Sequence, residues 1–184
     1  MALTYTPEAE LGRPCPDFRL PAVDEKEYSL SDFKNGKPFL VMFICNHCPY
    51  VKAIEDRLIA LGRDLKSIGV STVAICSNDW IDNPEDSFEN LQKRWKEKEY
   101  TFPYLHDADQ KVAHAFGAVC TPDFFLYDSS GHLAYRGRLD DSWKDPSKVT
   151  KKELFEAAQL LVKNQKAPEK QTPSMGCNIK WSQA

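Results

Sequence analysis

The stretch Phe39-Leu-Val-Met-Phe-Ile-Cys-Asn-His-Cys-Pro49 decides the fold of this chain. Its first six residues are a continuous apolar run, which is typical of a central strand buried on both faces. From Val51 to Ile68, apolar residues recur at intervals of three and four, which indicates a helix, and Pro49 is favoured in the first turn of a helix. The sequence therefore predicts that Cys45 and Cys48 lie where a buried strand ends and a helix begins.

An alternation of strands and helices extends on either side of this stretch. Gly69 ends the helix, and the β-branched segment Val70–Cys76 predicts a second buried strand. The other expected elements are a hairpin over 18–20 and 28–30, an inserted solvated helix over 88–95 after Asn83-Pro84, a short helix over 112–116 that Asp107 or Asp109 caps and Gly117 stops, a strand over 124–127 with its hairpin partner over 133–139, and a last helix over 154–161. This order predicts one α/β domain over residues 1–165 with a mixed sheet, followed by an irregular tail over 166–184 that carries Cys177.

Length and charge restrict the class of protein. The chain has 184 residues, 42% of them hydrophobic and 28% charged, which suits one globular domain with a buried core. Lys and Arg number 24 against 27 Asp and Glu, so the net charge of -3 provides no basic field for nucleic acid or an anionic membrane. No run approaches the roughly 18 apolar residues of a membrane helix, and the first residues lack the features of a secretory signal. We therefore expect a cytoplasmic protein with no nucleic-acid partner and no membrane partner.

The close cysteine pair carries the chemistry that the sequence suggests. Six unevenly spaced cysteines are too few for a disulfide scaffold, and only Cys45 and Cys48 lie close together. At a strand-to-helix junction, backbone N–H groups and the helix dipole stabilise a thiolate, and His47 adds a further donor that makes the disulfide form more oxidising. We therefore expect Cys45 to be the exposed thiol with the lowest pKa of the six, and Cys48 to attack a mixed disulfide formed on Cys45.

Two other readings of the pair stay open. A C-x-x-C pair also occurs as half of a zinc site, and Cys45, Cys48, Cys120 and Cys177 would then converge on zinc or on an iron–sulfur cluster. Such sites usually have a second close pair, which this chain lacks. Inert packing is the third reading, and it is the one expected for Cys15 and Cys76. The position of the pair favours a redox dithiol without a metal or an organic cofactor.

A second signal is Cys120-Thr-Pro122, directly before the strand that begins near Phe124. A proline at the opening of a buried strand cannot donate to the ladder, so it must lie at an edge, a bulge or a cis turn. A proline in this position, together with a dithiol after an earlier strand, is a stronger signal for a redox site than either feature alone.

Together these motifs resemble the thioredoxin superfamily. The similarity is to its redoxin branch, the alkyl hydroperoxide reductase/thiol-specific antioxidant (AhpC/TSA) type, and to the peroxiredoxin-like thioredoxin-domain proteins. The matching segments within 12–165 are Pro16–Leu20, Tyr28–Phe33, Phe43–Pro49, Gly117–Asp128 and Tyr135–Gly137, and the tail segment Pro173–Trp181 also matches. The resemblance implies a thioredoxin-like fold, with a mixed β-sheet flanked by helices, an extra N-terminal hairpin and an inserted helix.

The resemblance also implies roles for individual residues. Cys45 is the nucleophile, Cys48 is the resolving thiol, and Pro122 is a cis-proline whose preceding residue, Thr121, offers backbone hydrogen bonds to an extended substrate. The implied activity is thiol-disulfide exchange. Its partners are a disulfide-containing protein or small-molecule thiol and a thioredoxin- or glutathione-type reductant.

Two departures from the family pattern matter. Peroxiredoxins carry a Thr three residues before the peroxidatic Cys and a later Arg, whereas Cys45 and Pro122 occupy those places here. The overall branch favours thiol peroxidase as the alternative function, whereas the missing Thr and Arg oppose it. Thioredoxin has a buried acid on the strand before its dithiol, but residues 39–44 are wholly apolar. The proton acceptor for Cys48 is then His47, Glu55 or a water.

Two further cysteines are possible relay thiols. The assigned fold brings Cys120 next to the dithiol, where it is either a relay thiol or a packing residue. Cys177 is followed by Ile179 and Trp181, an apolar anchor that a disordered tail would not retain. We therefore expect this segment to dock on the domain and to hold Cys177 near the dithiol, Cys120 or the Thr121–Pro122 loop.

Hydrogen peroxide should be a poor substrate, because the Thr and Arg that polarise the O–O bond are missing. Stopped-flow oxidation of the reduced protein measures this. The expected rate is that of an ordinary low-pKa thiol, and a rate far above it would favour the peroxidase function.

Overall fold

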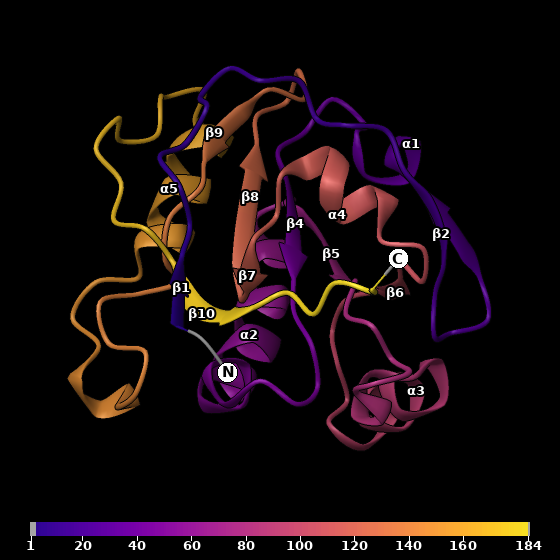
Figure 1. Cartoon of the computed structure of the whole chain (residues 1–184). Coiled ribbons are helices and arrows are strands. Elements are labelled where there is room, and N and C mark those ends of the chain that lie inside the picture. Colours follow the sequence, from indigo (N-terminus) through magenta and orange to yellow (C-terminus); the bar gives the residue numbers. More distant parts are fainter. Residues whose placement is uncertain (1–2, 184) are drawn as a thin grey trace.

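A five-stranded mixed sheet forms the centre of the computed structural model, which describes residues 3–183 (Figure 1). Its strands, in spatial order, are β6 (Tyr104–His106), β5 (Ser71–Cys76), β4 (Phe39–Phe43), β8 (Asp123–Tyr127) and β9 (Leu133–Tyr135). β4, β5 and β6 are parallel, whereas β8 and β9 are antiparallel to their neighbours. Every residue of β4 and β8 is buried, because helices cover both faces.

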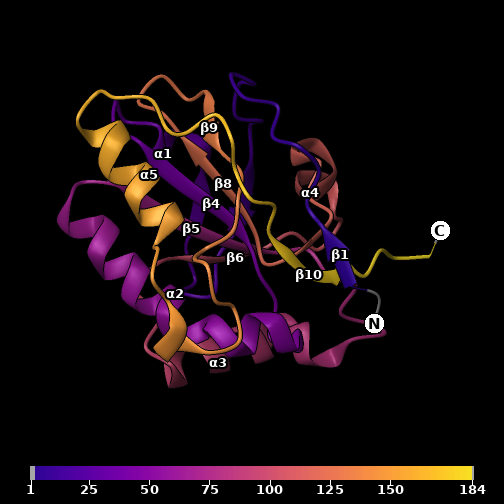
Figure 2. The ribbon, with the colours of Figure 1, turned by 90° about the vertical axis from the view of Figure 1, so that its left-hand side faces the viewer.

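Two apolar layers enclose this sheet. On one face, Leu40 and Met42 contact a core formed with α2 (Pro49–Ser67), α3 (Phe88–Glu97) and α5 (Glu153–Val162). On the other face, Phe39, Val41 and Phe43 contact a core formed with α1 (Leu30–Phe33) and α4 (Lys111–Phe116). Figure 2 shows α4 on one side of the sheet and α2 and α5 on the other. The strict alternation along β4 follows from its side chains pointing to opposite faces in turn.

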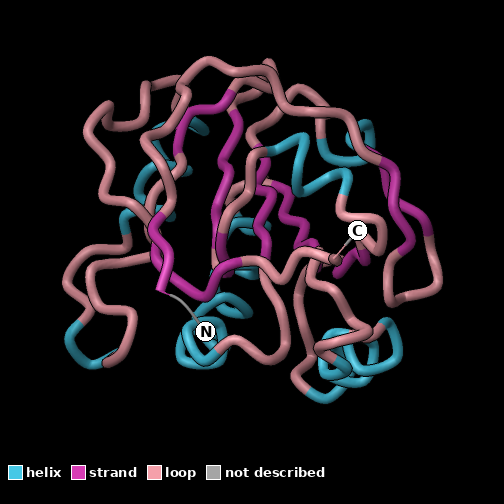
Figure 3. The backbone as a smooth tube through the Cα atoms, viewed as in Figure 1, coloured by secondary structure: helices cyan, strands magenta, loops and turns pink. Residues whose placement is uncertain are grey.

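A second, smaller sheet joins the two ends of the chain. Its strand order is β1 (Leu3–Tyr5), β10 (Met175–Asn178) and β7 (Cys120–Thr121), all antiparallel (Figures 1 and 3). β7 directly precedes β8, so this sheet lies at one end of the central sheet. The remaining elements are the hairpin β2 (Arg19–Pro21) and β3 (Glu27–Ser29) and two short 3-10 helices, η1 (Pro84–Asp86) and η2 (Pro146–Lys148).

Most elements expected from the sequence are confirmed. They include the N-terminal hairpin, the unit β4–α2–β5, the inserted helix α3, the hairpin β8–β9 and the last helix α5. Gly69 follows α2 with a φ of 83°, a left-handed conformation that glycine adopts without strain. Among the described residues, no helix is long and apolar enough to cross a membrane.

Four expectations are wrong in detail. The tail is not irregular throughout, because residues 175–178 form β10. Residues 1–2 of the predicted domain and residue 184 of the predicted tail lie outside the described residues. β6 was not expected, since three residues after a proline give little periodic signal. β9 ends at Tyr135, short of 139. The N-cap position of α4 is Gln110, with a φ of 62°, although both predicted acids accept N–H groups of the first turn, Asp109 from Lys111 and Asp107 from Val112 and Ala113.

A buried ion pair anchors the start of β8. Two guanidinium nitrogens of Arg136 donate to the Asp123 carboxylate at 3.2 and 2.8 Å, and the side chains are 5% and 0% exposed. Arg136 also donates to Gly117 O and lies 4.4 Å from the centre of the Phe125 ring. Removing one member of such a pair leaves the other charge buried without compensation.

The Arg136→Met substitution should destabilise the protein by about 3–5 kcal/mol, because it leaves the Asp123 carboxylate without its counter-charge. Urea unfolding followed by circular dichroism measures this difference. The control is the double substitution Arg136→Met/Asp123→Leu, which removes both charges and should cost less than the single substitution. Equal losses would show that Asp123 does not depend on Arg136.

Candidate active site

The dithiol lies where β4 gives way to α2. Cys48 is the N-cap residue of α2, and Pro49 begins the helix. Both sulfur-bearing residues are buried, with 2% of Cys45 and 0% of Cys48 exposed. The positive end of the dipole of a 19-residue helix therefore faces Cys48.

A single residue of the neighbouring loop contacts both sulfurs. Cys45 Sγ lies 3.3 Å from Thr121 Oγ1, and Cys48 Sγ lies 3.1 Å from Thr121 O. The following Thr121–Pro122 peptide bond is cis. The structure thus brings together four residues that the sequence singled out, although they come from two distant segments.

The surroundings shift the pKa values of the two thiols in opposite directions. The pKa of Cys48 is lowered to about 4, first because the Cys45 thiol donates to its sulfur and then because the Cys177 thiol and backbone N–H also donate to it. The pKa of Cys45 is raised well above its ordinary value by burial, by its bond to Cys48 and by the nearby Asp86 carboxylate. Of the two thiols, Cys48 therefore loses its proton more readily, and while it is protonated its S–H donates to Thr121 O.

This distribution corrects one expectation from the sequence. Cys45 is neither exposed nor the thiol with the lowest pKa. The reason is the position of each thiol. Cys48 lies at the N-terminus of α2 and beside the donors of Cys177, which lower its pKa. Cys45 precedes the helix and lies near the buried Asp86 carboxylate, which raises its pKa.

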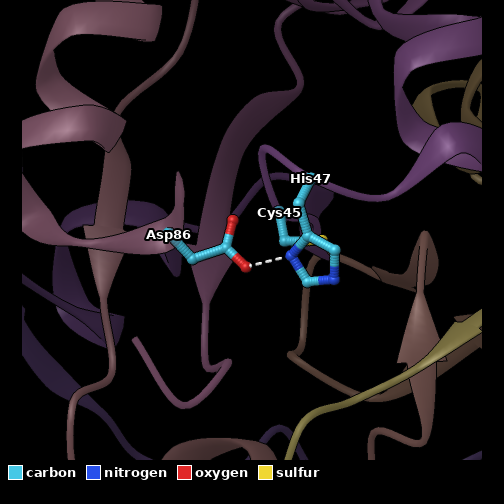
Figure 4. Close-up of side chains that lie close together, drawn as sticks. All are labelled: Cys45, His47 and Asp86. Atoms are coloured by element: carbon cyan, nitrogen blue, oxygen red, sulfur yellow. Dashed lines mark hydrogen bonds and ion pairs between the residues drawn. The ribbon is translucent and has the colours of Figure 1, made fainter. Parts of the chain in front are cut away.

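That acid, Asp86 of η1, was missed by the sequence analysis. It is completely buried, and its carboxylate accepts hydrogen bonds from Asn46 N at 2.7 Å, Asn78 Nδ2 at 2.8 Å and His47 Nδ1 at 2.5 Å (Figure 4). The opposite nitrogen of the imidazole, His47 Nε2, is buried without a hydrogen-bond partner among the described residues. His47 thus lies between the dithiol and the acid rather than against Cys48 alone. Nothing in the local sequence distinguishes Asp86 from its acidic neighbours.

Glu55 is excluded as the proton acceptor of the dithiol. Both of its carboxylate oxygens accept from Arg94, at 2.8 and 2.6 Å, and Oε1 also accepts from the Tyr100 hydroxyl at 2.7 Å. It is therefore part of a separate ion-pair network between α2 and α3.

The four-cysteine metal site is not assembled in the described part of the chain. One set of metal-binding side chains lies close together there, Cys45, His47 and Asp86, whose donor atoms are within 4.8 Å of one another. His47 and Asp86 are already hydrogen-bonded to each other, so an ion would have to displace that bond. Cys120 instead directs its sulfur to Pro122 O at 3.6 Å.

The docking expected of Cys177 is confirmed. Cys177 lies in β10 opposite Thr121, is 2% exposed, and its thiol and N–H donate to Cys48. Cys120 lies on the opposite face of β7 from Thr121, where burial raises its pKa. Cys76 is completely buried and burial raises its pKa, while the half-buried Cys15 has a pKa raised to about 12 by burial. Both packing assignments agree with these environments.

An apolar cavity opens beside the dithiol loop. It measures about 140 Å³, and its walls include Tyr50, Pro122, Leu139, Trp143 and Met175. The Tyr50 and Trp143 rings lie 4.7 Å apart between their centres. The cavity reaches the site through Pro122, the residue after Thr121, and its walls have the chemistry of a site for an apolar side chain.

A buried dithiol at a helix N-terminus, facing a cis-proline loop on a mixed sheet, defines a thioredoxin-like thiol-disulfide oxidoreductase. The chain belongs to the AhpC/TSA family, whose family model matches residues 11–136.

The chain is similar to several individual proteins. An uncharacterized conserved protein from Geobacillus kaustophilus is 42% identical, covers 100% of this chain and 98% of its own, and superposes with a TM-score of 0.94. The thiol:disulfide interchange protein DsbE of Escherichia coli (strain K12) is 28% identical over 165 residues, which is 85% of this chain and 82% of that protein. A thioredoxin family protein from Chlorobium tepidum TLS, titled a thiol:disulfide interchange protein, shares the fold at 21% identity, with a TM-score of 0.64 over 85% of this chain and 99% of its own.

The Asp86→Asn substitution should lower the pKa of Cys45, because it removes a negative charge that opposes the thiolate. In a Cys48→Ser background, the ultraviolet absorbance of the thiolate reports Cys45 separately from Cys48. Adding Asp86→Asn should make this absorbance appear at lower pH. Asp82→Asn, an exposed acid of the same segment, is the control and should leave the titration unchanged.

Proposed function

We propose that Cys45 and Cys48 form the redox centre and exchange disulfides with a protein or small-molecule substrate. The observation that carries the proposal is the position of the two sulfurs, which both contact Thr121 of the cis-proline loop while Cys48 lies at the N-terminus of α2. In the reducing direction, the substrate disulfide becomes two thiols while the dithiol becomes the Cys45–Cys48 disulfide. The same steps run backwards when the protein acts as an oxidant.

We assign the first attack to Cys48. Resemblance to the family implies the opposite order, with Cys45 first, but the charge distribution supports Cys48 because only a thiolate is a strong nucleophile. Cys48 Sγ bonds to one substrate sulfur, and the other substrate sulfur leaves as a thiolate. Cys45 then loses its proton, attacks Cys48 Sγ and releases the second substrate sulfur.

The Asp86–His47 pair is the proposed acceptor of the Cys45 proton. The ligand atoms of His47 and Asp86 lie within 4.8 Å of Cys45 Sγ. Because the Asp86 carboxylate is completely buried, little water competes with it for the proton. His47 was proposed from the sequence to stabilise a Cys45 thiolate. Its bond to Asp86 supports a role in moving the proton instead.

The proposed substrate is a disulfide-containing protein. The cavity beside Pro122 supports this choice, because it can take an apolar side chain next to a reacting cysteine. The name of the Escherichia coli relative, a thiol:disulfide interchange protein, supports the same class of substrate. A thioredoxin- or glutathione-type reductant and a cytoplasmic location remain part of the proposal.

Thiol peroxidase is the second candidate, because the chain belongs to the AhpC/TSA family. Arg136 does not serve such a reaction, since Asp123 and Gly117 O hold its guanidinium. Thr121 does place a hydroxyl beside Cys45, but it is not the Thr of the family pattern.

Trapping separates the two orders of attack. If Cys48 attacks first, the double substitution Cys45→Ser/Cys177→Ser should accumulate a mixed disulfide at Cys48 with a model protein disulfide, because no neighbouring thiol is left to displace the substrate. Cys48→Ser should react far more slowly, by about tenfold or more, since Cys45 keeps its proton near neutral pH. Mass spectrometry of the quenched mixtures measures both, and fast trapping at Cys45 in Cys48→Ser would restore the order that the resemblance implies.

A further inference from the structure

β10 covers the backbone edge from which the dithiol can be approached. It pairs antiparallel with β7, with Cys177 opposite Thr121 and Asn178 opposite Cys120. Thr121 is also the residue that contacts both sulfurs of the dithiol. A polypeptide that presents a cysteine to this dithiol by adding a strand to β7 would therefore have to lie where β10 lies.

β10 is held there closely at both ends. Before the strand, Ser174 Oγ donates to Pro122 O at 2.9 Å, and after it Lys180 N donates to Asn78 Oδ1 at 2.9 Å. Ile179 is 1% exposed in the core under the central sheet. The residues directly before and after β10 are therefore both bound to the domain, and they fix the position of Cys177.

Gly176 sets how close β10 can come. A Cβ atom at this residue would lie 1.8 Å from Thr121 O and 2.5 Å from Thr121 C, distances that no real side chain can adopt. Gly176 is not among the glycines with positive φ, so the close approach and not the backbone conformation requires glycine. Any side chain here must push β10 away from β7.

The sulfur of Cys177 faces Cys48. Its thiol and its backbone N–H donate to the Cys48 sulfur, whereas the Cys120 sulfur lies on the other side of β7. Burial first, and then the charge on Cys48, raise the pKa of Cys177 to about 12. In a Cys45–Cys48 disulfide that charge is gone, so one cause that disfavours a Cys177 thiolate disappears.

We propose that Cys177 is a third redox residue of this site, an internal substrate that takes the disulfide from the dithiol through Cys48. This inference rests on the proposed function. The Cys177 thiolate attacks Cys48 Sγ of the Cys45–Cys48 disulfide, the Cys48–Cys177 bond forms, and Cys45 leaves and takes up the proton that Cys177 released. No net oxidation occurs, because the disulfide only changes partners. The product fixes β10 covalently over β7 and closes the edge to other strands.

The Cys45→Ser protein tests this step directly with glutathione disulfide as the oxidant. Cys48 first forms a mixed disulfide with glutathione, and Cys177 then displaces the second glutathione. Mass spectrometry after acid quenching and alkylation should find the Cys48–Cys177 disulfide as the main product. A stable glutathione adduct at Cys48, with Cys177 still alkylated, would overturn the proposal.

Gly176→Val provides the matched structural test, because it keeps every cysteine but forces β10 from β7. In the Cys45→Ser background it should reduce the yield of the Cys48–Cys177 disulfide at least tenfold, while Cys15→Ser, at a distant half-buried thiol, should leave the yield unchanged. An unchanged yield in a folded Gly176→Val protein would contradict the proposal, and if this variant does not fold, the Cys45→Ser result decides alone. Wild-type protein separates the two claims: failure to form any disulfide at Cys48 or to reduce a substrate disulfide sinks the proposed function, whereas formation of Cys45–Cys48 without any Cys48–Cys177 sinks only this inference.

Discussion

The contact of both dithiol sulfurs with Thr121 is the interaction on which the site depends. It holds two buried thiols beside one residue, where a thiolate on one disfavours a thiolate on the other, so a single charge must be placed. The surroundings decide where: Cys48 lies at the N-terminus of α2 and beside the donors of Cys177 in β10, whereas the Asp86 carboxylate opposes charge on Cys45. The sheet, the helix and the C-terminal strand each contribute one part of this asymmetry.

The framework of the protein could be predicted because it is encoded locally. The apolar run of β4, the helical periodicity of α2 and the β-branched β5 each follow from neighbouring residues, and they fix where the dithiol lies. The proline before β8 predicted, with the family resemblance, which loop would meet it.

The charge state of the dithiol could not be predicted, because it depends on residues that only tertiary structure brings together. Asp86 is one of several acids in its loop, and only burial beside His47 distinguishes it. β10 is four residues long with a glycine inside, so its propensity is weak and its pairing with β1 and β7 creates the strand. The expectation that Cys45 is exposed was wrong for the same reason. Residues distant in the sequence, such as Thr121, bury it, and their position leaves no periodic signal near Cys45 in the sequence.

The place of β10 in the chain has a consequence for biosynthesis. Every element of the central sheet is translated before β10, and domains begin to fold from their N-terminal parts during synthesis. A nascent chain can therefore assemble β4, α2 and the Thr121–Pro122 loop while the edge of β7 is still open and Cys48 lacks the donors of Cys177. Ribosome-bound chains would hold the dithiol in a different electrostatic state from the finished protein, with its charge distribution completed only when the last strand arrives.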